Sequence, residues 1–291
     1  MKCEEMLNET IKALNNLRER VPLTQCITNK VTVNDCANAL LAIGASPLMS
    51  DEVLEQREIV SIEQALVLNI GTITQSQAGS MFIAADEANK TDTPIVLDPV
   101  GFGVSNYRNT IVSKIAKDNK ITVVRGNMSE IKAMCSYFGF LDNLDLTKAK
   151  GVDVADSDII SEDNLENNAR IVKELAKGLN TTVMASGPID IISNGRETYT
   201  IKNGDSLMPR ITGSGCMLSS IVGGFVGSND NPLIATIAAG LAMGISGEIA
   251  AEYSRENNLG SGSFRNILID ELYKINKDTI LKRAELEKLE L

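Results

Sequence analysis

The chain has 291 residues, of which 43% are hydrophobic, and a net charge of −10. A chain of this length can bury most of its unfolded surface, and no linker rich in Pro, Gly or Ser divides it, so we expect one domain over residues 1–291. The acidic surplus argues against a non-specific nucleic-acid binder, because phosphate contacts need clustered Lys and Arg.

The N-terminus opens a charged amphipathic segment, and no apolar run approaches 18 residues, so we expect a cytoplasmic protein that is neither secreted nor membrane-spanning. Five cysteines without CxxC spacing favour reduced thiols over a disulfide framework or a cysteine zinc site. Histidine is absent, which excludes Cys–His and Ser–His nucleophile pairs and His-ligated metals. Proton transfer must therefore use a carboxylate, a thiol, a lysine, a tyrosine or water.

The first predicted elements are two helices and a short strand. Apolar side chains recur at close to helical spacing over residues 4–20, which predicts a surface helix ending before Pro22. Residues 33–43 predict a second helix closed by Gly44, and residues 47–49 a short buried strand.

Short apolar runs then alternate with helix-like stretches. The runs predict buried strands at residues 65–70, 94–97, 121–124 and 181–185. The stretches between them predict helices at residues 78–89, 109–116 and 164–179. This alternation indicates an α/β fold with a mainly parallel sheet.

The pattern changes from residue 190 onward. Asn194-Gly195 lies between β-rich flanks, which predicts an antiparallel hairpin over residues 190–201 with a type I′ turn. After Thr212 the chain turns mostly helical. Helices are predicted at residues 219–226, 233–253 and 264–275, and the charged tail 276–291 is expected to continue as an exposed helix.

A glycine-rich loop precedes the first of these late helices. Glycines let the backbone approach a ligand closely, and the free N–H groups and dipole of a helix start favour negative charge. We therefore predict an anion hole formed by Gly213, Ser214 and Gly215, with Cys216 where its thiolate is stabilised. The alternative is a turn before a core helix with a buried cysteine.

Polar residues also follow three predicted strands. Asp98 follows the run 95–97, Arg125 follows Val124, and Ser186 follows Ala185. Ligands of such sheets gather beyond the carboxyl ends of the strands, where these side chains should lie. A strand-end Asp is also common as an ordinary cap or turn residue.

Neither the Gx4GK[ST] loop nor a GxGxxG after the first strand occurs, so the P-loop and Rossmann fingerprints are missing. Several spaced motifs instead resemble those of the hydroxyethylthiazole kinase family, within the ribokinase-like superfamily. Between about Val21 and Ile267 the motifs are Cys26-Ile-Thr-Asn29, Gly44-Ala-Ser-Pro-Leu-Met-Ser50, Asn69-Ile-Gly-Thr72, Leu97-Asp-Pro-Val-Gly101, Arg125-Gly-Asn-x-Ser-Glu130 and Thr212-Gly-Ser-Gly-Cys-Met-Leu218.

The resemblance implies a ribokinase-like three-layer α/β/α fold and an enzyme that phosphorylates the hydroxyl of 4-methyl-5-(2-hydroxyethyl)thiazole in thiamine salvage. ATP would be the co-substrate and Mg²⁺ the cofactor. Phosphoryl transfer needs an aligned alcohol and fixed donors for the transferred group, which the N–H groups of residues 213–216 could supply. The family also implies a homotrimer with sites between neighbouring subunits. The acidic charge and the lack of a long apolar run predict neither a nucleic-acid nor a membrane partner.

The resemblance further implies roles for individual residues. Cys216 occupies the position at which most ribokinase-like enzymes have an aspartate base, and a helix N-terminus can lower the pKa of a thiol, so it is the candidate proton acceptor or positioning group. Asp98 and Glu130 match positions that organise Mg²⁺, partly through water. Their alternatives are a strand-end cap and an exposed helix acid.

Arg125 and Ser186 match ATP contacts, while Met49 and Gly213 match substrate contacts. The alternatives are a plain surface arginine for Arg125 and a core side chain for Met49. Two positions depart from the family pattern: Gln25 stands where many relatives carry His, and Ser214 replaces a common Thr.

Other functions remain open on the residues alone. The alcohol could be a hydroxymethylpyrimidine, a pyridoxal-type compound or a sugar, although Met49 and Cys216 favour the thiazole. An ATP-dependent dehydratase on the same scaffold should prefer Asp in the glycine loop. A third possibility is a ligand sensor that binds nucleotide without turnover.

Overall fold

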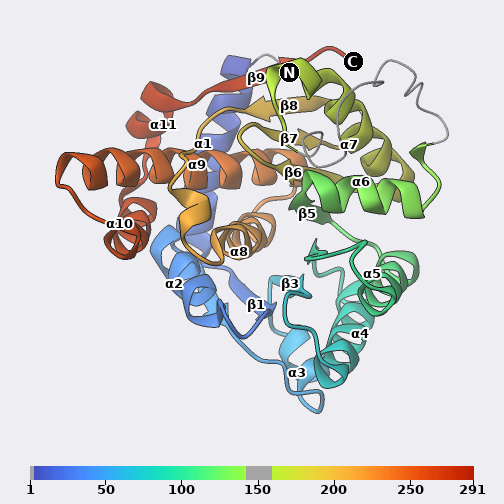
Figure 1. The fold of residues 1–291 in the computed structure, drawn as a ribbon. Helices are drawn as coiled ribbons and strands as arrows, with labels where there is room; N and C mark the ends of the chain where they lie inside the picture. Colours follow the sequence, from blue (N-terminus) through green and yellow to red (C-terminus); the bar gives the residue numbers. More distant parts are fainter. Residues whose placement is uncertain (1–2, 142–158) are drawn as a thin grey trace.

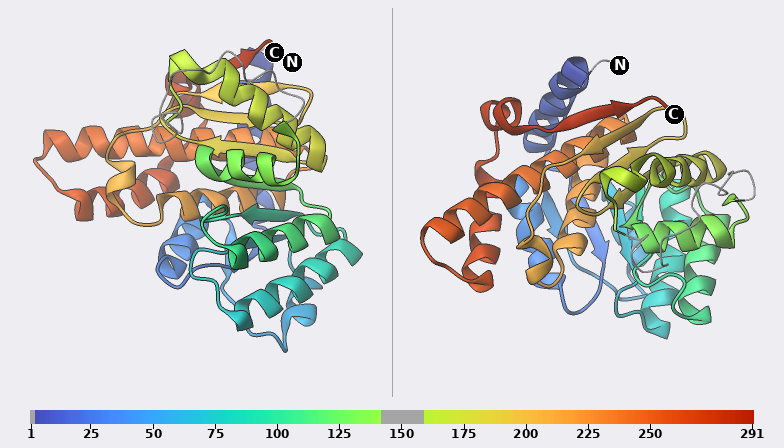
Figure 2. Two further views of the ribbon diagram at one scale, coloured as in Figure 1. Left: turned by 45° about the vertical axis from the view of Figure 1, so that its right-hand side comes forward. Right: turned by 45° about the horizontal axis from the view of Figure 1, so that its top comes forward.

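A computed structural model describes residues 3–141 and 159–291. Its described residues form one nine-stranded sheet in the order β2-β1-β3-β4-β5-β6-β7-β8-β9 (Figures 1 and 2). The strands are β1 (Leu23–Ile27), β2 (Ser46–Leu48), β3 (Ala65–Asn69), β4 (Ile95–Asp98), β5 (Val123–Asn127), β6 (Thr182–Ser186), β7 (Asp190–Ser193), β8 (Thr198–Ile201) and β9 (Leu286–Leu289). Strands β1 to β6 pair in parallel and β6 to β9 antiparallel, which confirms the mainly parallel sheet.

Helices cover both faces of this sheet (Figure 1). The helices are α1 (Cys3–Arg20), α2 (Val33–Ile43), α3 (Gln56–Val60), α4 (Gln75–Lys90), α5 (Asn106–Asp118), α6 (Met128–Tyr137), α7 (Leu165–Leu179), α8 (Ser214–Val226), α9 (Pro232–Glu256), α10 (Ser261–Lys274) and α11 (Lys277–Arg283), with short 3₁₀ turns at Glu162–Asn164 and Met208–Arg210. One core packs the sheet against α1, α2, α8 and α9, and a second packs it against α4 to α7. The three-layer arrangement is therefore confirmed.

The central strands are short and apolar because both of their faces are covered. All five residues of β3 are buried, and β4 is buried throughout. Strand β2 is only half-buried, against expectation, because it forms an edge of the sheet. Helix α9 is long and apolar enough to cross a membrane by length and composition, but 83% of its most apolar window is buried in the protein core.

The predicted hairpin is confirmed, but its turn is not type I′. Ser193 pairs with Thr198, and Asn194 N–H donates to the carbonyl of Glu197. Gly195 has φ +83°, whereas Arg196 is not among the residues with positive φ, so the second condition of a type I′ turn fails. The Asn194 side chain instead accepts from the N–H groups of residues 196 and 197, which closes the turn.

The prediction of a helical tail is wrong beyond Arg283. Helix α11 ends there, and β9 pairs antiparallel with β8. An exposed edge of β8 offers unpaired backbone groups that a following segment can satisfy. Lys288 adds an ion pair to Glu197, with N and O 3.1 Å apart.

Candidate active site

The glycine loop lies at the start of α8, as predicted. Gly213 is the N-cap with φ +81°, and a Cβ there would lie 2.2 Å from Cγ2 of Thr32, so a larger residue does not fit. The helix begins at Ser214, ahead of the predicted residue 219. The N–H groups of its first turn have no partners within the helix and are available to an anion.

Arg125 lies against this loop. Its guanidinium is nearly buried in β5, and a Cβ added to Gly215 would lie 2.6 Å from Nη1. Nη2 donates to Oγ of Ser186 at 2.5 Å, and Nη1 lies 3.7 Å from Oδ2 of Asp98. The alternative of a plain surface arginine is therefore wrong, and a fixed positive charge lies beside the predicted anion hole.

Asp98 is buried at the end of β4. Its Oδ2 accepts from Asn69 Nδ2 and Ser219 Oγ, each at 2.7 Å, while Oδ1 has no partner among the described residues. Burial raises the pKa of Asp98 to about 6, although Arg125 acts in the opposite direction. An ionisable oxygen without a partner is expensive to bury unless something binds it.

Cys216 is half-buried in the first turn of α8. Its sulfur accepts from Asn29 Nδ2 at 3.0 Å and from Asn69 Nδ2 at 3.3 Å. The pKa of the thiol is raised, mainly by burial and to a lesser extent by the negative charge of Asp98. Hydrogen bonds with Thr32 and the two amides act in the opposite direction. The expectation of a lowered pKa is wrong here, because burial and a nearby carboxylate disfavour the thiolate.

Glu130 is buried, so the alternative of an exposed helix acid is wrong. It forms a capping box with Asn127 at the start of α6, where Oε2 accepts from Asn127 N–H at 2.8 Å. Oε1 accepts from Gly101 N–H at 2.8 Å. Glu130 therefore joins the loop after β4, which follows Asp98, to the end of β5, which carries Arg125.

Met49 lies apart from this cluster, in a small cavity of about 190 Å³. Met49 is half-buried rather than a full core residue. The cavity is lined by Cys26, Thr28, Lys30, Val33, Met49, Ser50 and Asp51. It adjoins the cluster through the segment 28–33, whose Asn29 contacts Cys216 and whose Thr32 packs on Gly213. Gln25 donates to Gln56 at 2.7 Å and to the carbonyl of Ser50, which lines the cavity, at 3.2 Å.

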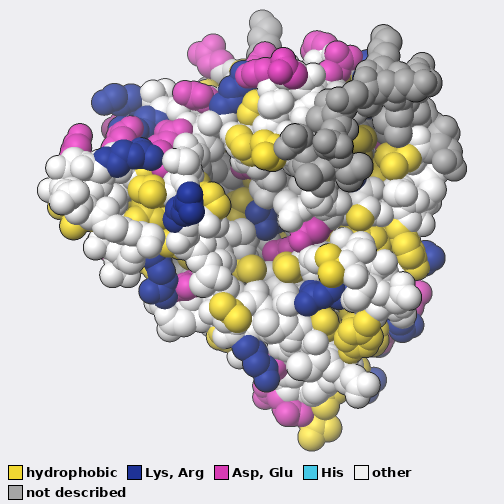
Figure 3. Space-filling view, viewed as in Figure 1, with side chains coloured by type: hydrophobic (Ala, Val, Ile, Leu, Met, Phe, Trp, Pro, Cys, Tyr) yellow, Lys and Arg dark blue, Asp and Glu magenta, His cyan; other side chains and the backbone are white. Residues whose placement is uncertain are grey.

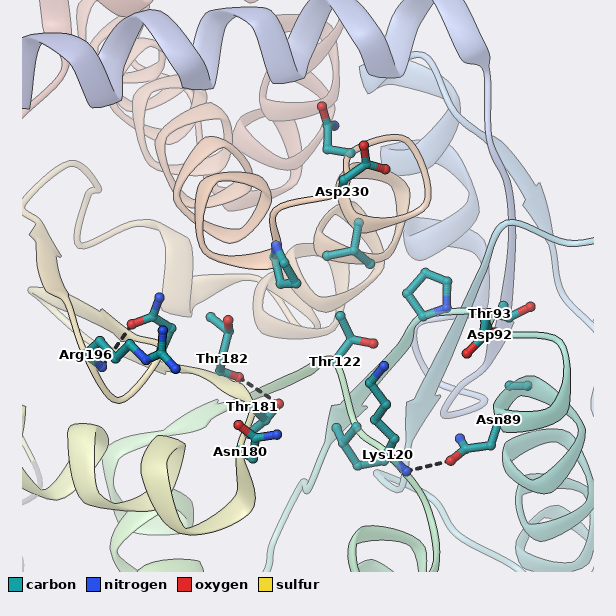
Figure 4. A pocket seen from close by; sticks show the side chains of 17 residues that line it. Asn89, Asp92, Thr93, Lys120, Thr122, Asn180, Thr181, Thr182, Arg196 and Asp230 are labelled. Carbon is teal, nitrogen blue, oxygen red and sulfur yellow. Dashed lines mark hydrogen bonds between the residues drawn. The ribbon is translucent and has the colours of Figure 1, made fainter. Parts of the chain in front are cut away.

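The cavity of about 490 Å³ shown in Figure 4 lies elsewhere. Its walls include the segments that lead into β4, β5 and β6, so it lies at the opposite ends of these strands from Asp98 and Ser186. Its charged side chains are Lys120, Arg196, Asp92 and Asp230, and it includes none of the predicted site residues. We therefore place the chemistry at the carboxyl ends of the strands. On the face drawn in Figure 3, acidic and basic side chains meet near the centre, where β3, β5 and α8 converge in Figure 1.

Several residues that hold the site together had no role in the sequence analysis. Asn69 lay in a quoted motif, and Ser219 lies one helical turn after Gly215. Arg108, in the first turn of α5, donates to the carbonyl oxygens of Ile70 and Val100 at 2.6 Å and of Gly71 at 2.7 Å. No quoted motif includes Ser219 or Arg108, because their partners are distant in sequence. Buried Asp190, near Arg125, was likewise missed, and burial raises its pKa to about 6.

Comparisons with known proteins agree with one another. A family model described as the hydroxyethylthiazole kinase family matches residues 14–278. The hydroxyethylthiazole kinase of Methanobrevibacter smithii is 49% identical over 284 residues, covering 98% of each chain. Hydroxyethylthiazole kinase 1 of Methanosphaera stadtmanae is 50% identical over 286 residues, covering 98% of this chain and 99% of its own.

One solved structure agrees with this family, and a more distant one shares the fold. The hydroxyethylthiazole kinase protein from Pyrococcus horikoshii OT3 superposes with a TM-score of 0.85 at 36% identity, covering 97% of this chain and 99% of that one. A Staphylococcus aureus pyridoxal kinase in complex with ADP gives a TM-score of 0.53 at 13% identity, which indicates a shared fold alone.

Proposed function

The chain belongs to the hydroxyethylthiazole kinase family, and we propose that the cluster around Cys216 is its active site. Members of this family phosphorylate the hydroxyl of the hydroxyethylthiazole in thiamine salvage, and the chain is such a phosphotransferase, with ATP as co-substrate. The observation that carries the proposal is the convergence of Asp98, Arg125 and Cys216 at the start of α8.

The transferred phosphoryl group would lie over the N–H groups of residues 213–216. Negative charge spreads over this group in the transition state, and donors that are already in place stabilise it without reorganisation. Arg125 supplies a buried positive charge next to Gly215, and Ser186 holds the guanidinium from β6. These contacts support Arg125 and Ser186 as the residues that orient ATP.

Cys216 would align the hydroxyl of the thiazole alcohol. Its sulfur lies in the first turn of α8, beside the proposed position of the phosphoryl group. A loose transition state demands little base strength, so orientation of the alcohol accounts for much of this contribution. The raised pKa means that the thiol keeps its proton, so Cys216 would position the hydroxyl rather than act as its base.

Asp98 and Glu130 would organise Mg²⁺. The fit rests on the buried Oδ1 of Asp98, which lacks a protein partner, and on carboxylate oxygens being the ligands that Mg²⁺ prefers. Mg²⁺ would neutralise charge on the phosphates of ATP. Glu130 already accepts two backbone N–H groups, so its oxygens suit contact with the ion through water.

The thiazole ring would occupy the cavity beside Met49. A polarisable thioether suits a flat heteroaromatic ring. Gly213, the other proposed substrate contact, adjoins this region through Thr32, whose Cγ2 packs against it. The cavity of about 190 Å³ is small for a ligand site. This agrees with a site completed by a second subunit.

We also propose that the chain acts as a homotrimer, in the cytoplasm, as a single domain. Two large apolar side chains near cavity-lining residues in the sequence have most of their surface exposed: Val31, next to Lys30, at 63%, and Leu54, three residues after Asp51, at 87%. Exposed apolar groups at the rim of an incomplete pocket favour a subunit contact there. The continuous sheet supports the single domain.

The decisive experiment measures Mg²⁺-dependent release of ADP from ATP. The alcohol is hydroxyethylthiazole in one arm and a hydroxymethylpyrimidine in a second, and the third has no alcohol. We expect release with the thiazole alone. Release with the pyrimidine instead would change the substrate, and no release from folded protein would support a nucleotide-binding sensor.

A further inference from the structure

Asn69 lies between the two groups on which the chemistry depends. It ends β3, next to Asp98 at the end of β4, and the two residues are partners in the sheet register. Its side chain is 2% exposed and touches both the Asp98 carboxylate and the Cys216 sulfur. Ser219 touches the carboxylate without bonding the sulfur, and Asn29 touches the sulfur without bonding the carboxylate. Asn69 therefore connects the Asp98 carboxylate to the Cys216 sulfur.

A single backbone group determines how the Asn69 amide is oriented. Gly71 N–H donates to Oδ1 of Asn69 at 2.9 Å, and a backbone N–H can only donate. Nδ2 of Asn69 must therefore face Oδ2 of Asp98 at 2.7 Å and the sulfur at 3.3 Å. Because Asn29 faces the same Oδ1 at 3.2 Å, its own Nδ2 must also point inward, toward the sulfur at 3.0 Å.

The sulfur of Cys216 consequently receives two amide N–H groups from fixed directions. An amide nitrogen has no lone pair to offer, so neither asparagine can accept a proton from the thiol. The sulfur therefore acts toward both asparagines as an acceptor, and the S–H of the neutral thiol must point away from them. Thr32 is the third polar neighbour of the sulfur, so the two amides and Thr32 together limit the directions in which the thiol can face the proposed alcohol.

We propose that Asn69 is a positioning residue that fixes the direction in which the Cys216 thiol faces the substrate hydroxyl and aligns the sulfur with Asp98. The inference rests on the proposed role of Cys216. Asn69 acts through two residues and has no contact with the reacting atoms. Its removal should therefore reduce turnover more than substrate affinity.

The test is a double-mutant cycle measured as ADP release with the thiazole alcohol. Asn69→Leu removes both donated hydrogen bonds at similar volume, Cys216→Ala removes the sulfur, and Ser219→Ala removes the other donor to Asp98. Asn89→Leu is the matched control, because Asn89 also accepts a backbone N–H, from Lys120 at 2.6 Å, but lies at the opposite ends of the strands.

We expect Asn69→Leu to lower kcat about 10- to 100-fold, with KM for the thiazole changed less than about threefold, as for the loss of buried hydrogen bonds at a reacting group. In the Cys216→Ala background, Asn69→Leu should lower kcat no more than Ser219→Ala does. Without the sulfur, Asn69, like Ser219, contributes only its hydrogen bond to Asp98. Asn89→Leu should leave kcat unchanged.

Full multiplication of the Asn69→Leu and Cys216→Ala effects would overturn the proposal while leaving the role of Cys216 intact. Near wild-type turnover of Cys216→Ala would instead reject the proposed role of the cysteine, and this inference with it. If Asn69→Leu unfolds, Asn69→Ala removes the same two donated hydrogen bonds with a smaller side chain and no added charge. It should show the same loss of kcat, and wild-type turnover would overturn the proposal.

Discussion

The guanidinium of Arg125 lies so close to the backbone of Gly215 that a Cβ on residue 215 would be 2.6 Å from Nη1 and 3.0 Å from Nη2. The glycine loop and the Arg125 guanidinium therefore form one surface, in which backbone N–H groups lie beside a buried positive charge. A side chain at residue 215 would have to displace the arginine, since the opposing atoms belong to a group held by Ser186.

Gly215→Ala should therefore impair ATP use. The methyl group pushes Arg125 away from the loop, so we expect kcat/KM for ATP to fall at least about tenfold, as for the loss of one charged contact. Gly79→Ala is the matched control, because Gly79 is helical and a Cβ there meets nothing within 4 Å. It should keep full activity. Equal kinetics of the two variants would show that Arg125 does not orient ATP.

Cys216→Ala should lower kcat with little change in thermal stability. The thiol is half-buried, so its loss should cost little stability, whereas the alcohol loses the group proposed to position it. We expect a fall of about 10- to 100-fold, since a loose transition state keeps part of the rate without a base. Cys3→Ala, at the start of α1, is the control thiol and should have wild-type turnover. Unchanged turnover of Cys216→Ala would contradict the proposed role.

Asp98→Asn should raise the Mg²⁺ concentration needed for half-maximal rate. The amide keeps the shape but loses the charge and presents a donor or a weaker acceptor to the ion. We expect a shift of about tenfold or more, measured by titrating Mg²⁺ at saturating ATP. Asp190→Asn is a useful comparison, because Asp190 is another buried strand-end acid with a raised pKa. A larger Mg²⁺ shift in Asp190→Asn would reassign the metal site.

The sequence predicted the sheet well because its central strands are buried on both faces. Runs such as Ala65–Asn69 are apolar throughout, and few other structures suit such short segments. Asp98, Arg125 and Ser186 were placed at strand ends by the same reasoning, and the structure brings them together.

Other features depended on contacts between distant segments. The pKa of Cys216 was expected to be lowered by the helix start, but burial and Asp98 raise it. The tail was expected to be helical, yet the open edge of β8 draws residues 286–289 into a strand. The asparagine–glycine pair predicted a type I′ turn, but the Asn194 side chain closes a different one. Each of these outcomes depends on a partner that local patterns do not reveal.

Glu63 provides a test of electrostatics away from the site. Its carboxylate is buried and neither oxygen has a partner among the described residues, and burial raises its pKa from 4.5 to about 8. Between about pH 4.5 and pH 8, the Glu63 carboxyl is therefore protonated in the folded state and ionised in the unfolded state. The free energy of unfolding should therefore fall as pH rises from about 4.5 to about 8.

Glu63→Gln should remove this dependence, because the amide stays neutral. We expect its Tm to exceed the wild-type value by several degrees at pH 9, with a smaller gap at pH 5, since each pKa unit corresponds to about 1.4 kcal/mol. Thermal melts followed by circular dichroism across this range provide the measurement. A gap that is constant with pH would mean that Glu63 does not titrate as its burial implies.

Leu54→Asp should separate assembly from folding. Leu54 is 87% exposed and lies three residues after Asp51, which lines the Met49 cavity. A charge there costs the isolated subunit little, yet it would oppose an apolar contact between subunits. We expect a smaller species in analytical ultracentrifugation and a higher KM for the thiazole, because a shared site loses part of its wall. Leu281→Asp, at 49% exposure on α11, is the control and should change neither. If dilute, demonstrably monomeric protein keeps full turnover, each subunit holds a complete site, and the exposed Leu54 needs another explanation.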